Sequence, residues 1–240
     1  MPYTDNKETQ ATLLQKTEVQ VKGVLFDVDG TLVDTAPDLV AALNASLLEE
    51  NFATHNVDSL RHAASHGSLH LVRCALPNES EATHISIQQK LLAHYHKLNG
   101  EHARLFDGMT GLLNLLNKHN IPFGVVTNKQ AKFARPLMKA LSLDTHCKAT
   151  VSGDSTKHPK PHPAPMLLAA QQISVDPQNI LYLGDAERDL IAAQNASMIG
   201  GTALWGYIAK TDEPESWPAT VTFDTPDSVA KWLVATNFEI

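Results

Sequence analysis

The feature that most constrains the fold is a short apolar segment that ends in two carboxylates. Val21-Lys22-Gly23-Val24-Leu25 has the composition of a buried strand, and Phe26-Asp27-Val28-Asp29-Gly30-Thr31-Leu32 follows it directly. Two carboxylates two residues apart repel each other unless a cation or a shared proton offsets their charge. At this strand end we therefore expect a bound metal, acid–base chemistry, or both.

After this segment the chain alternates between strand-like and helix-like segments. We expect further strands over residues 121–127, 149–151, 180–183 and 198–205. Helical spacing of apolar residues falls between and after them, over residues 109–117, 131–141, 163–172, 190–196 and 228–235. Repeated strand–helix units predict an α/β fold, with a Rossmann-like parallel sheet covered by helices on both faces.

One block interrupts this alternation. Between the first strand and residue 104 there is no strand signal, whereas residues 36–51, 69–76 and 85–98 show helical patterns. We interpret residues 37–103 as an inserted α-helical domain. The core then consists of residues 21–36 and 104–240, and residues 1–20 form a loose N-terminal segment.

Polar residues lie at the carboxyl ends of three of the expected strands. Asp27 and Asp29 follow the first strand, Thr127 and Asn128 follow the next, and Asp185 follows the strand at 180–183. Ligands of parallel α/β sheets bind at the carboxyl ends of the strands. We therefore expect these side chains to form one site.

The first pair of aspartates can divide two chemical tasks. Asp27 can attack an electrophile and form a covalent intermediate, and Asp29 can protonate a leaving group and later deprotonate water. Gly30 permits a tight turn whose amides can bind a phosphate, and Thr31 adds a hydroxyl. The alternative is a plain Asp-Gly turn without a catalytic role.

Three further residues can bind phosphoryl oxygens. Thr127 and Asn128 offer a hydroxyl and an amide, although both also suit a helix N-cap. Lys160 lies between Pro159 and Pro161, which restrict its backbone, so its ammonium can be positioned to neutralise phosphoryl charge. The alternative for this lysine is a solvated basic loop.

A second acidic pair predicts a metal site. Asp185 and Asp189 are four residues apart at the start of a helix and share one face. Acidic residues also suit a helix N-terminus for electrostatic reasons alone. Mg²⁺ prefers oxygen ligands. Asp27, Asp185 and the backbone carbonyl of Asp29 make a plausible set, with Asp189 supporting them from the next layer.

The composition argues against several partners. The net charge is −7, whereas a nucleic-acid-binding protein usually needs a basic face. No apolar run reaches the roughly 18 residues that span a bilayer, and the first twenty residues lack the apolar segment of a signal peptide. We expect a cytoplasmic protein with no membrane partner. Cys74 and Cys147 lack metal-type or redox spacing and are expected to be reduced thiols.

In this order, the motifs resemble those of the haloacid dehalogenase superfamily. The similar segments are Asp27-Val28-Asp29-Gly30-Thr31, Thr127-Asn128, Lys160, and Gly184-Asp185 with Asp189. The resemblance extends from residue 21 to residue 232. It implies that Asp27 attacks phosphorus, that Asp29 acts as acid and then base, and that Mg²⁺ bridges Asp27, substrate and Asp185. Because the dehalogenases usually lack an aspartate at the Asp29 position, this chain resembles the phosphoryl-transfer branch.

Within the superfamily the chain is similar to phosphoglycolate phosphatases and to N-acetylmuramic acid 6-phosphate phosphatases. The runs that carry this similarity include residues 125–129, 160–165 and 206–208. The resemblance implies a Mg²⁺-dependent phosphatase for a small phosphorylated metabolite such as phosphoglycolate. We expect a monomer or homodimer. N-acetylmuramic acid 6-phosphate or another sugar phosphate is the alternative substrate. A sugar phosphomutase and a non-catalytic binding protein are further alternatives.

The helical insert resembles the small cap domain that closes over the site in this superfamily and carries much of its substrate choice. Ser65, His66 and Gly67 form a break between two expected cap helices. We predict that these three residues face the site when the cap closes. An ordinary turn between helices is the alternative.

Overall fold

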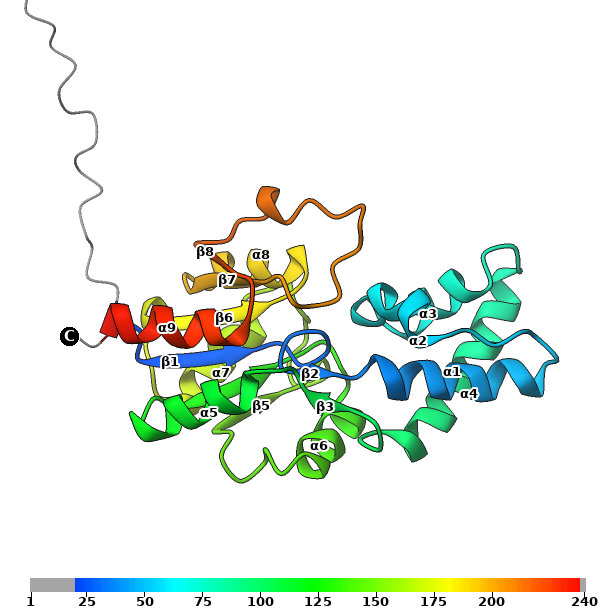
Figure 1. The fold of residues 1–240 in the computed structure, drawn as a ribbon, viewed down its shortest axis with the longest axis horizontal. Helices are drawn as coiled ribbons and strands as arrows, with labels where there is room; N and C mark the ends of the chain where they lie inside the picture. The colour runs from blue at the N-terminus through cyan, green and yellow to red at the C-terminus, as the bar shows by residue number, and fades with distance from the viewer. Residues whose placement is uncertain (1–19, 238–240) are drawn as a thin grey trace, which may run out of the picture.

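The computed structural model describes residues 20–237, and a six-stranded parallel sheet lies at its centre (Figure 1). From one edge to the other the strands are β5 (Ala149–Val151), β4 (Phe123–Val126), β1 (Gly23–Phe26), β6 (Ile180–Gly184), β7 (Ile199–Ala203) and β8 (Val221–Phe223). In this register Leu25 of β1 lies between Gly124 and Tyr182. The expected α/β sheet is confirmed, and the strand that carries the first acidic pair is central.

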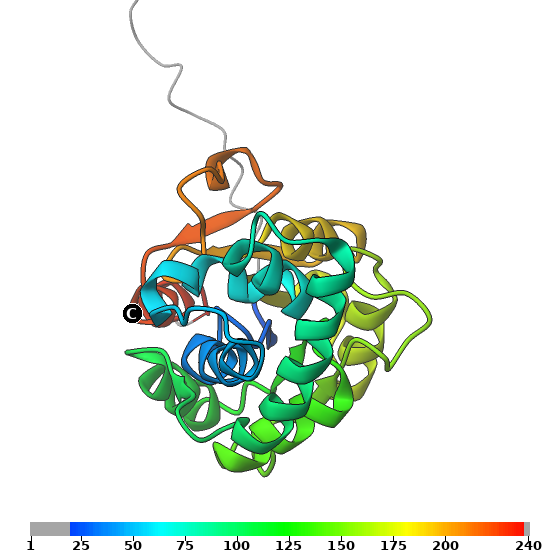
Figure 2. The ribbon, with the colours of Figure 1, turned by 90° about the vertical axis from the view of Figure 1, so that its right-hand side faces the viewer.

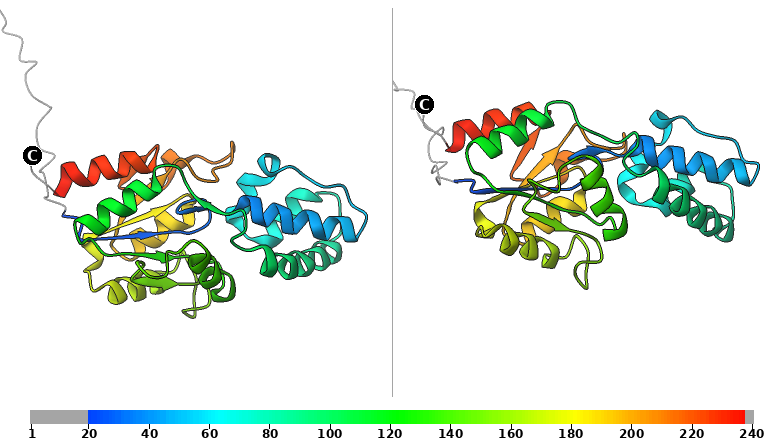
Figure 3. Two further views of the ribbon diagram at one scale, coloured as in Figure 1. Left: turned by 60° about the horizontal axis from the view of Figure 1, so that its bottom comes forward. Right: turned by 90° about the horizontal axis from the view of Figure 1, so that it is seen from below.

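Helices cover both faces of the sheet because alternate residues of a strand point to opposite faces. Val24 and Phe26 pack in one apolar core, and Leu25 packs in another. The first core includes residues of α5 (Met109–Lys118), α6 (Ala131–Ala140) and α9 (Pro226–Asn237). The second includes residues of α7 (Ala164–Ile173) and α8 (Glu187–Asn195). Figure 3 shows these helices as layers on either side of the sheet.

A helical cap lies beyond the carboxyl ends of the strands (Figures 1 and 2). Its helices are α1 (Ala36–Glu49), α2 (Val57–Leu60), the 3₁₀ helix η1 (Arg61–His66), α3 (Ser68–Ala75) and α4 (Glu81–Leu98). They enclose an apolar core of their own, in which Leu43, Leu71 and Leu91 are fully buried. Two short antiparallel strands, β2 (Val33–Asp34) and β3 (Arg104–Leu105), join the chain entering the cap to the chain leaving it.

The observed boundaries differ from the expected ones mainly at capped ends and short strands. Helix α4 begins at Glu81 because the Ser80 hydroxyl accepts a hydrogen bond from the Thr83 amide at 3.2 Å. The sequence patterns missed β8, which has three residues at the sheet edge, and the two-residue strands β2 and β3. Short 3₁₀ helices η2 (Pro177–Asn179) and η3 (Pro214–Ser216) were also not expected.

Two expectations concern the terminal segment and the cysteines. The prediction of a loose segment over residues 1–20 falls almost wholly on residues 1–19, which lie outside the described residues. Cys74 and Cys147 are free thiols, and both are partly buried.

Candidate active site

The carboxyl ends of three adjacent strands bring the predicted acidic and polar residues together. Asp27 follows β1, Thr127 follows β4 and Asp185 follows β6. All three residues are at most 3% exposed. Because β1 pairs with both β4 and β6, these side chains meet at one edge of the sheet. The sequence prediction that they lie close together is therefore correct.

Lys160 is a buried cation at this edge rather than part of a solvated loop. Its ammonium nitrogen lies 3.0 Å from Asp27 Oδ1 and 2.7 Å from Asp189 Oδ1. It also donates hydrogen bonds to the Val126 carbonyl at 2.8 Å and to the Tyr182 hydroxyl at 2.7 Å. With these partners around it the lysine position is fixed, which suits a cation that must face developing negative charge.

The Asn128 side chain holds the Lys160 backbone. Its Nδ2 donates to the Lys160 carbonyl at 3.0 Å, and its Oδ1 accepts from the Lys160 amide at 2.9 Å. From the sequence, the Asn128 amide was predicted to bind phosphoryl oxygens. In the structure it is instead hydrogen-bonded to the backbone of Lys160. Thr127 Oγ1 accepts a hydrogen bond from the Lys129 amide at 3.1 Å and stabilises the turn after β4.

Three carboxylates share the space around Lys160. Oxygens of Asp27, Asp185 and Asp189 lie within 4.8 Å of one another, and all three residues are buried. Burial, together with Asp27 and Asp189, raises the pKa of Asp185 to about 7. The negative charge around Asp185 therefore disfavours its ionised form, and a divalent cation would offset that charge. The all-oxygen donor set fits Mg²⁺, so the chemistry of these residues is compatible with such an ion.

Thr31 and the cap residue Ser65 contact the same carboxylate. Thr31 Oγ1 lies 3.3 Å from Asp185 Oδ1, and Ser65 Oγ lies 2.9 Å from Asp185 Oδ2. Ser65 Oγ also lies 3.0 Å from the Asp29 carbonyl oxygen. The Tyr207 amide donates to Asp185 Oδ2 at 2.9 Å. A cap residue therefore contacts the acidic cluster directly.

Asp29 is paired with a lysine that sequence analysis did not select. Lys129 Nζ lies 2.7 Å from Asp29 Oδ1 and 3.0 Å from Oδ2, and the Thr35 hydroxyl also donates to Asp29. Burial alone would lower the pKa of Lys129, but the adjacent Asp29 outweighs burial and raises it. Lys129 directly follows the Thr127-Asn128 pair and belongs to the 125–129 run that carries the family similarity, but no role was predicted for it.

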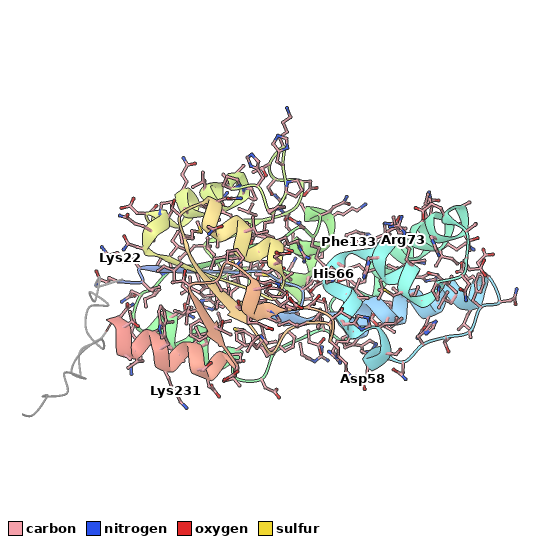
Figure 4. The ribbon with its side chains drawn as sticks, turned by 90° about the horizontal axis from the view of Figure 1, so that it is seen from above. Lys22, Asp58, His66, Arg73, Phe133 and Lys231 are labelled. Carbon is pink, nitrogen blue, oxygen red and sulfur yellow. The ribbon has the colours of Figure 1, made fainter. Side chains whose placement is uncertain are left out.

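A cavity of about 400 Å³ lies between the sheet edge and the cap. On the core side Asp27, Asp29 and Thr127 line it. The predicted cap residues Ser65, His66 and Gly67 line the same cavity, so the structure brings them to the site. Figure 4 shows His66 and Phe133 at the junction of core and cap, whereas Asp58 and Arg73 lie in the cap and Lys22 and Lys231 on the core.

Arg188 connects the two sides of this cavity. It belongs to α8 of the core, and its Nη2 donates to the backbone carbonyl of Ser65 in the cap at 2.8 Å. Burial opposes its charge, but Asp189, Asp27 and Asp185 outweigh burial and raise its pKa. Arg188 could not be predicted from the sequence, because its spacing does not distinguish it from other helix residues beside Asp185 and Asp189.

Among residues 20–237, no helix is long and apolar enough to span a bilayer.

Comparison with known proteins gives consistent matches over most of the chain. A family model described as haloacid dehalogenase-like hydrolase matches residues 24–199. A phosphoglycolate phosphatase of Xanthomonas campestris pv. campestris is 38% identical over 205 residues, which are 85% of this chain and 93% of that protein. An N-acetylmuramic acid 6-phosphate phosphatase of Pseudomonas putida is 35% identical over 214 residues, which are 89% of this chain and 96% of that protein.

Among solved structures, one described as a predicted phosphoglycolate phosphatase from Haemophilus somnus superposes with a TM-score of 0.77. Its sequence identity is 26%, and the match covers 89% of this chain and 98% of that one. The similarity therefore includes both the sheet and the cap.

Proposed function

The chain belongs to the haloacid dehalogenase-like hydrolases, and we propose that it is a phosphatase that acts on a small phosphorylated metabolite. It is an enzyme of the phosphoric monoester hydrolase class. The observation that carries the proposal is the meeting of Asp27, Lys160 and Asp185 at one sheet edge, beside a cavity that the cap covers. Phosphate monoesters are among the slowest substrates to hydrolyse in water, so their hydrolysis needs several catalytic groups at once.

The proposed reaction has two steps. In the first, an oxygen of Asp27 forms a bond to phosphorus while the bond from phosphorus to the leaving oxygen breaks, and Asp29 donates a proton to that oxygen. In the second, Asp29 takes a proton from water, the water oxygen attacks phosphorus, and the Asp27 carboxylate leaves with its electron pair. The products are the alcohol and inorganic phosphate.

The remaining residues neutralise the charge of the phosphoryl group and hold it in position. Lys160 neutralises phosphoryl charge as it develops and is held for this by Asn128. Thr31, Thr127 and Asn128 are proposed to contact phosphoryl oxygens. For Asn128 this contact competes with the hydrogen bonds that its side chain already makes.

Mg²⁺ is the proposed cofactor. Asp27, Asp185 and the backbone carbonyl of Asp29 would hold the ion, and Asp189 would support them while paired with Lys160. When bound, the ion supplies positive charge that offsets the carboxylate cluster and polarises a phosphoryl oxygen. The raised pKa of Asp185 supports this assignment, because the surrounding negative charge disfavours the ionised carboxylate and a bound cation would offset that charge.

Phosphoglycolate is the first candidate substrate, and a sugar phosphate is the second. The first is supported by the 38% identity to the Xanthomonas phosphatase. The second is supported by the Pseudomonas relative and by the cavity, whose 400 Å³ lies in the range of pockets that enclose much larger ligands than a two-carbon ester.

We also propose the domain boundaries, the cap residues that contact substrate, the location and the oligomeric state of the enzyme. We assign residues 37–103 to the cap and residues 21–36 with 104–240 to the catalytic core. Ser65, His66 and Gly67 are proposed to contact substrate. The enzyme is proposed to be cytoplasmic, in keeping with its free thiols, and to act as a monomer or homodimer without nucleic-acid or membrane partners.

A phosphate-release assay tests the proposal. Purified protein with Mg²⁺ is expected to release phosphate from phosphoglycolate or N-acetylmuramic acid 6-phosphate, and chelation by EDTA is expected to stop the reaction. Asp27→Asn is expected to lower kcat by more than ~10³-fold. Isomerised sugar phosphate in place of free phosphate would indicate a mutase, and an inactive wild type would contradict the proposal.

A further inference from the structure

Tyr95 is a buried polar side chain that the proposed mechanism does not use. It lies in α4 of the cap, is 1% exposed and lines the cavity beside the proposed catalytic residues. Among residues 20–237 no group accepts the proton of its hydroxyl, and the Lys129 ammonium can interact with that hydroxyl only as a donor. A buried hydroxyl without an acceptor costs free energy, so such groups in native proteins usually have a partner or a function.

The surroundings of Tyr95 fix its ring but do not provide an acceptor for its proton. The Phe133 ring packs against it with ring centroids 5.3 Å apart, and the Lys129 ammonium lies 4.9 Å from the ring centroid. An ammonium group donates hydrogen bonds and cannot accept one. The phenol is therefore held rigidly with its proton unshared.

The hydroxyl keeps this proton at physiological pH. The pKa of Tyr95 is raised to about 12, chiefly by burial. The nearby Lys129 ammonium opposes this increase, and the Asp29 carboxylate adds to it. A protonated phenol beside a cavity can donate to an oxygen atom brought there by a ligand.

The position of Tyr95 relative to the acid–base residue defines which part of a ligand it can reach. Lys129 bridges the two residues, because it binds both carboxylate oxygens of Asp29 and lies over the Tyr95 ring. Since Asp29 must reach the leaving oxygen, a group near Lys129 lies on the leaving-group side of the phosphate. The cavity wall here also contains apolar side chains, Leu39, Leu92 and Phe133.

We propose that the Tyr95 hydroxyl is a specificity-determining donor, which hydrogen-bonds an oxygen acceptor in the part of the substrate beyond its phosphate. The inference rests on the proposed phosphatase function and adds a recognition element to it. The acceptor is a carboxylate, hydroxyl or amide oxygen. Phosphate esters whose leaving group lacks such an oxygen leave the phenol proton unpaired and are bound less well.

Two esters of equal length test this directly. Phosphoglycolate and ethyl phosphate both carry two carbons on the ester oxygen, but only phosphoglycolate has an acceptor beyond it. N-acetylglucosamine 6-phosphate, which carries hydroxyl and amide oxygens but no carboxylate, tests neutral acceptors. Binding is measured by calorimetry with Mg²⁺ in the Asp27→Asn background, with and without Tyr95→Phe, so that the result does not depend on turnover.

Tyr95→Phe keeps the ring packing and removes only the hydroxyl. We expect it to lower the preference for an acceptor-bearing ester over ethyl phosphate, expressed as the ratio of dissociation constants, by about tenfold. A shift with phosphoglycolate identifies a carboxylate acceptor, and a shift with N-acetylglucosamine 6-phosphate alone identifies a hydroxyl or amide oxygen. If neither ratio changes, the inference is wrong.

A thermal melt separates recognition from a structural role. Removing an unpaired buried hydroxyl is expected to leave Tm unchanged or raise it, whereas a lower Tm would show that the hydroxyl stabilises the fold and would contradict the inference. Wild-type turnover is assayed separately. Inactivity there would overturn the proposed function, while the binding ratios would still decide the role of Tyr95.

Discussion

The environment of Asp185 is unfavourable to the charge of its carboxylate. It is buried beside Asp27 and Asp189, and these surroundings raise its pKa to about 7. In the metal-free protein the folded state then binds a proton that the unfolded state releases above pH 4. The stability contributed by this proton is present at low pH and is lost as pH rises toward 7.

The pH dependence of stability follows from this residue. With EDTA present, Tm of the wild type is expected to fall between about pH 5 and pH 7.5 more steeply than Tm of Asp185→Asn, because the amide carries no charge. Mg²⁺ at pH 7.5 should raise Tm of the wild type and have little effect on the variant. If Tm depends on pH equally in the two proteins, the ionised form of Asp185 is not disfavoured in the folded state.

Some residues of the site could be predicted from the sequence, and others could not. Asp27, Thr127 and Asp185 were predictable because each ends a strand in a parallel sheet. Lys129, Arg188 and Tyr95 were not, because their position depends on tertiary packing between the cap and the core. The role of the Asn128 side chain was missed for the same reason: its partner, Lys160, is far away in sequence.

At the scale of elements, a buried carboxylate ties the start of the cap to its end. Asp38 of α1 is fully buried and accepts hydrogen bonds from the backbone amides of Gly100, His102 and Ala103 at 2.7, 2.7 and 3.2 Å. These amides belong to the segment that follows α4. The two connections of the cap are thereby held side by side, next to the β2–β3 pair.

Loss of this carboxylate should destabilise the protein strongly. Asp38→Ala leaves three backbone donors without their acceptor, so we expect the free energy of unfolding to fall by ~3 kcal/mol. Urea denaturation measures this change. Asp58→Ala is the matched control in the cap, because Asp58 is exposed and its ion pair with Arg61 is long, 3.7 Å, so its loss should cost less than ~1 kcal/mol. Equal effects of both substitutions would contradict this role for Asp38.

Elements with clear apolar patterns were predictable. The strand 180–183 and most core helices were expected close to their observed bounds, because burial leaves continuous or periodic apolar positions in the sequence. The three-residue strand 149–151 was also expected, although it is as short as β8. Strand β8 and the pair β2–β3 are too short to show a period. Their formation depends on partners that only the folded chain brings near.

At the scale of the whole molecule, the cap and the core meet through a few polar contacts around the site. Ser65 contacts Asp185 and the Asp29 carbonyl through its hydroxyl, and Arg188 holds its backbone. Tyr207, from the core, donates from its hydroxyl to Asp34 Oδ1 at 2.6 Å and packs among the cap residues. The same contacts that close the cavity therefore involve the acidic cluster.

Ser65→Ala tests whether the hydroxyl helps to hold the cap in place. We expect amide hydrogen exchange over residues 61–75 to become several-fold faster, because the contacts to Asp185 and Asp29 are lost. Exchange in α9, on the far side of the core, should stay the same and serves as an internal control. Unchanged exchange in the cap segment would show that the remaining contacts are sufficient.

Asp27 is proposed to carry the phosphoryl group between the two steps of the reaction. Rapid quenching of the wild type during turnover of a ³²P-labelled phosphate ester, followed by peptide mapping, detects this covalent intermediate. We predict label on the peptide that contains Asp27, and none in Asp27→Asn. Release of labelled phosphate without labelled protein at any time point, or label on a different residue, would contradict the claim.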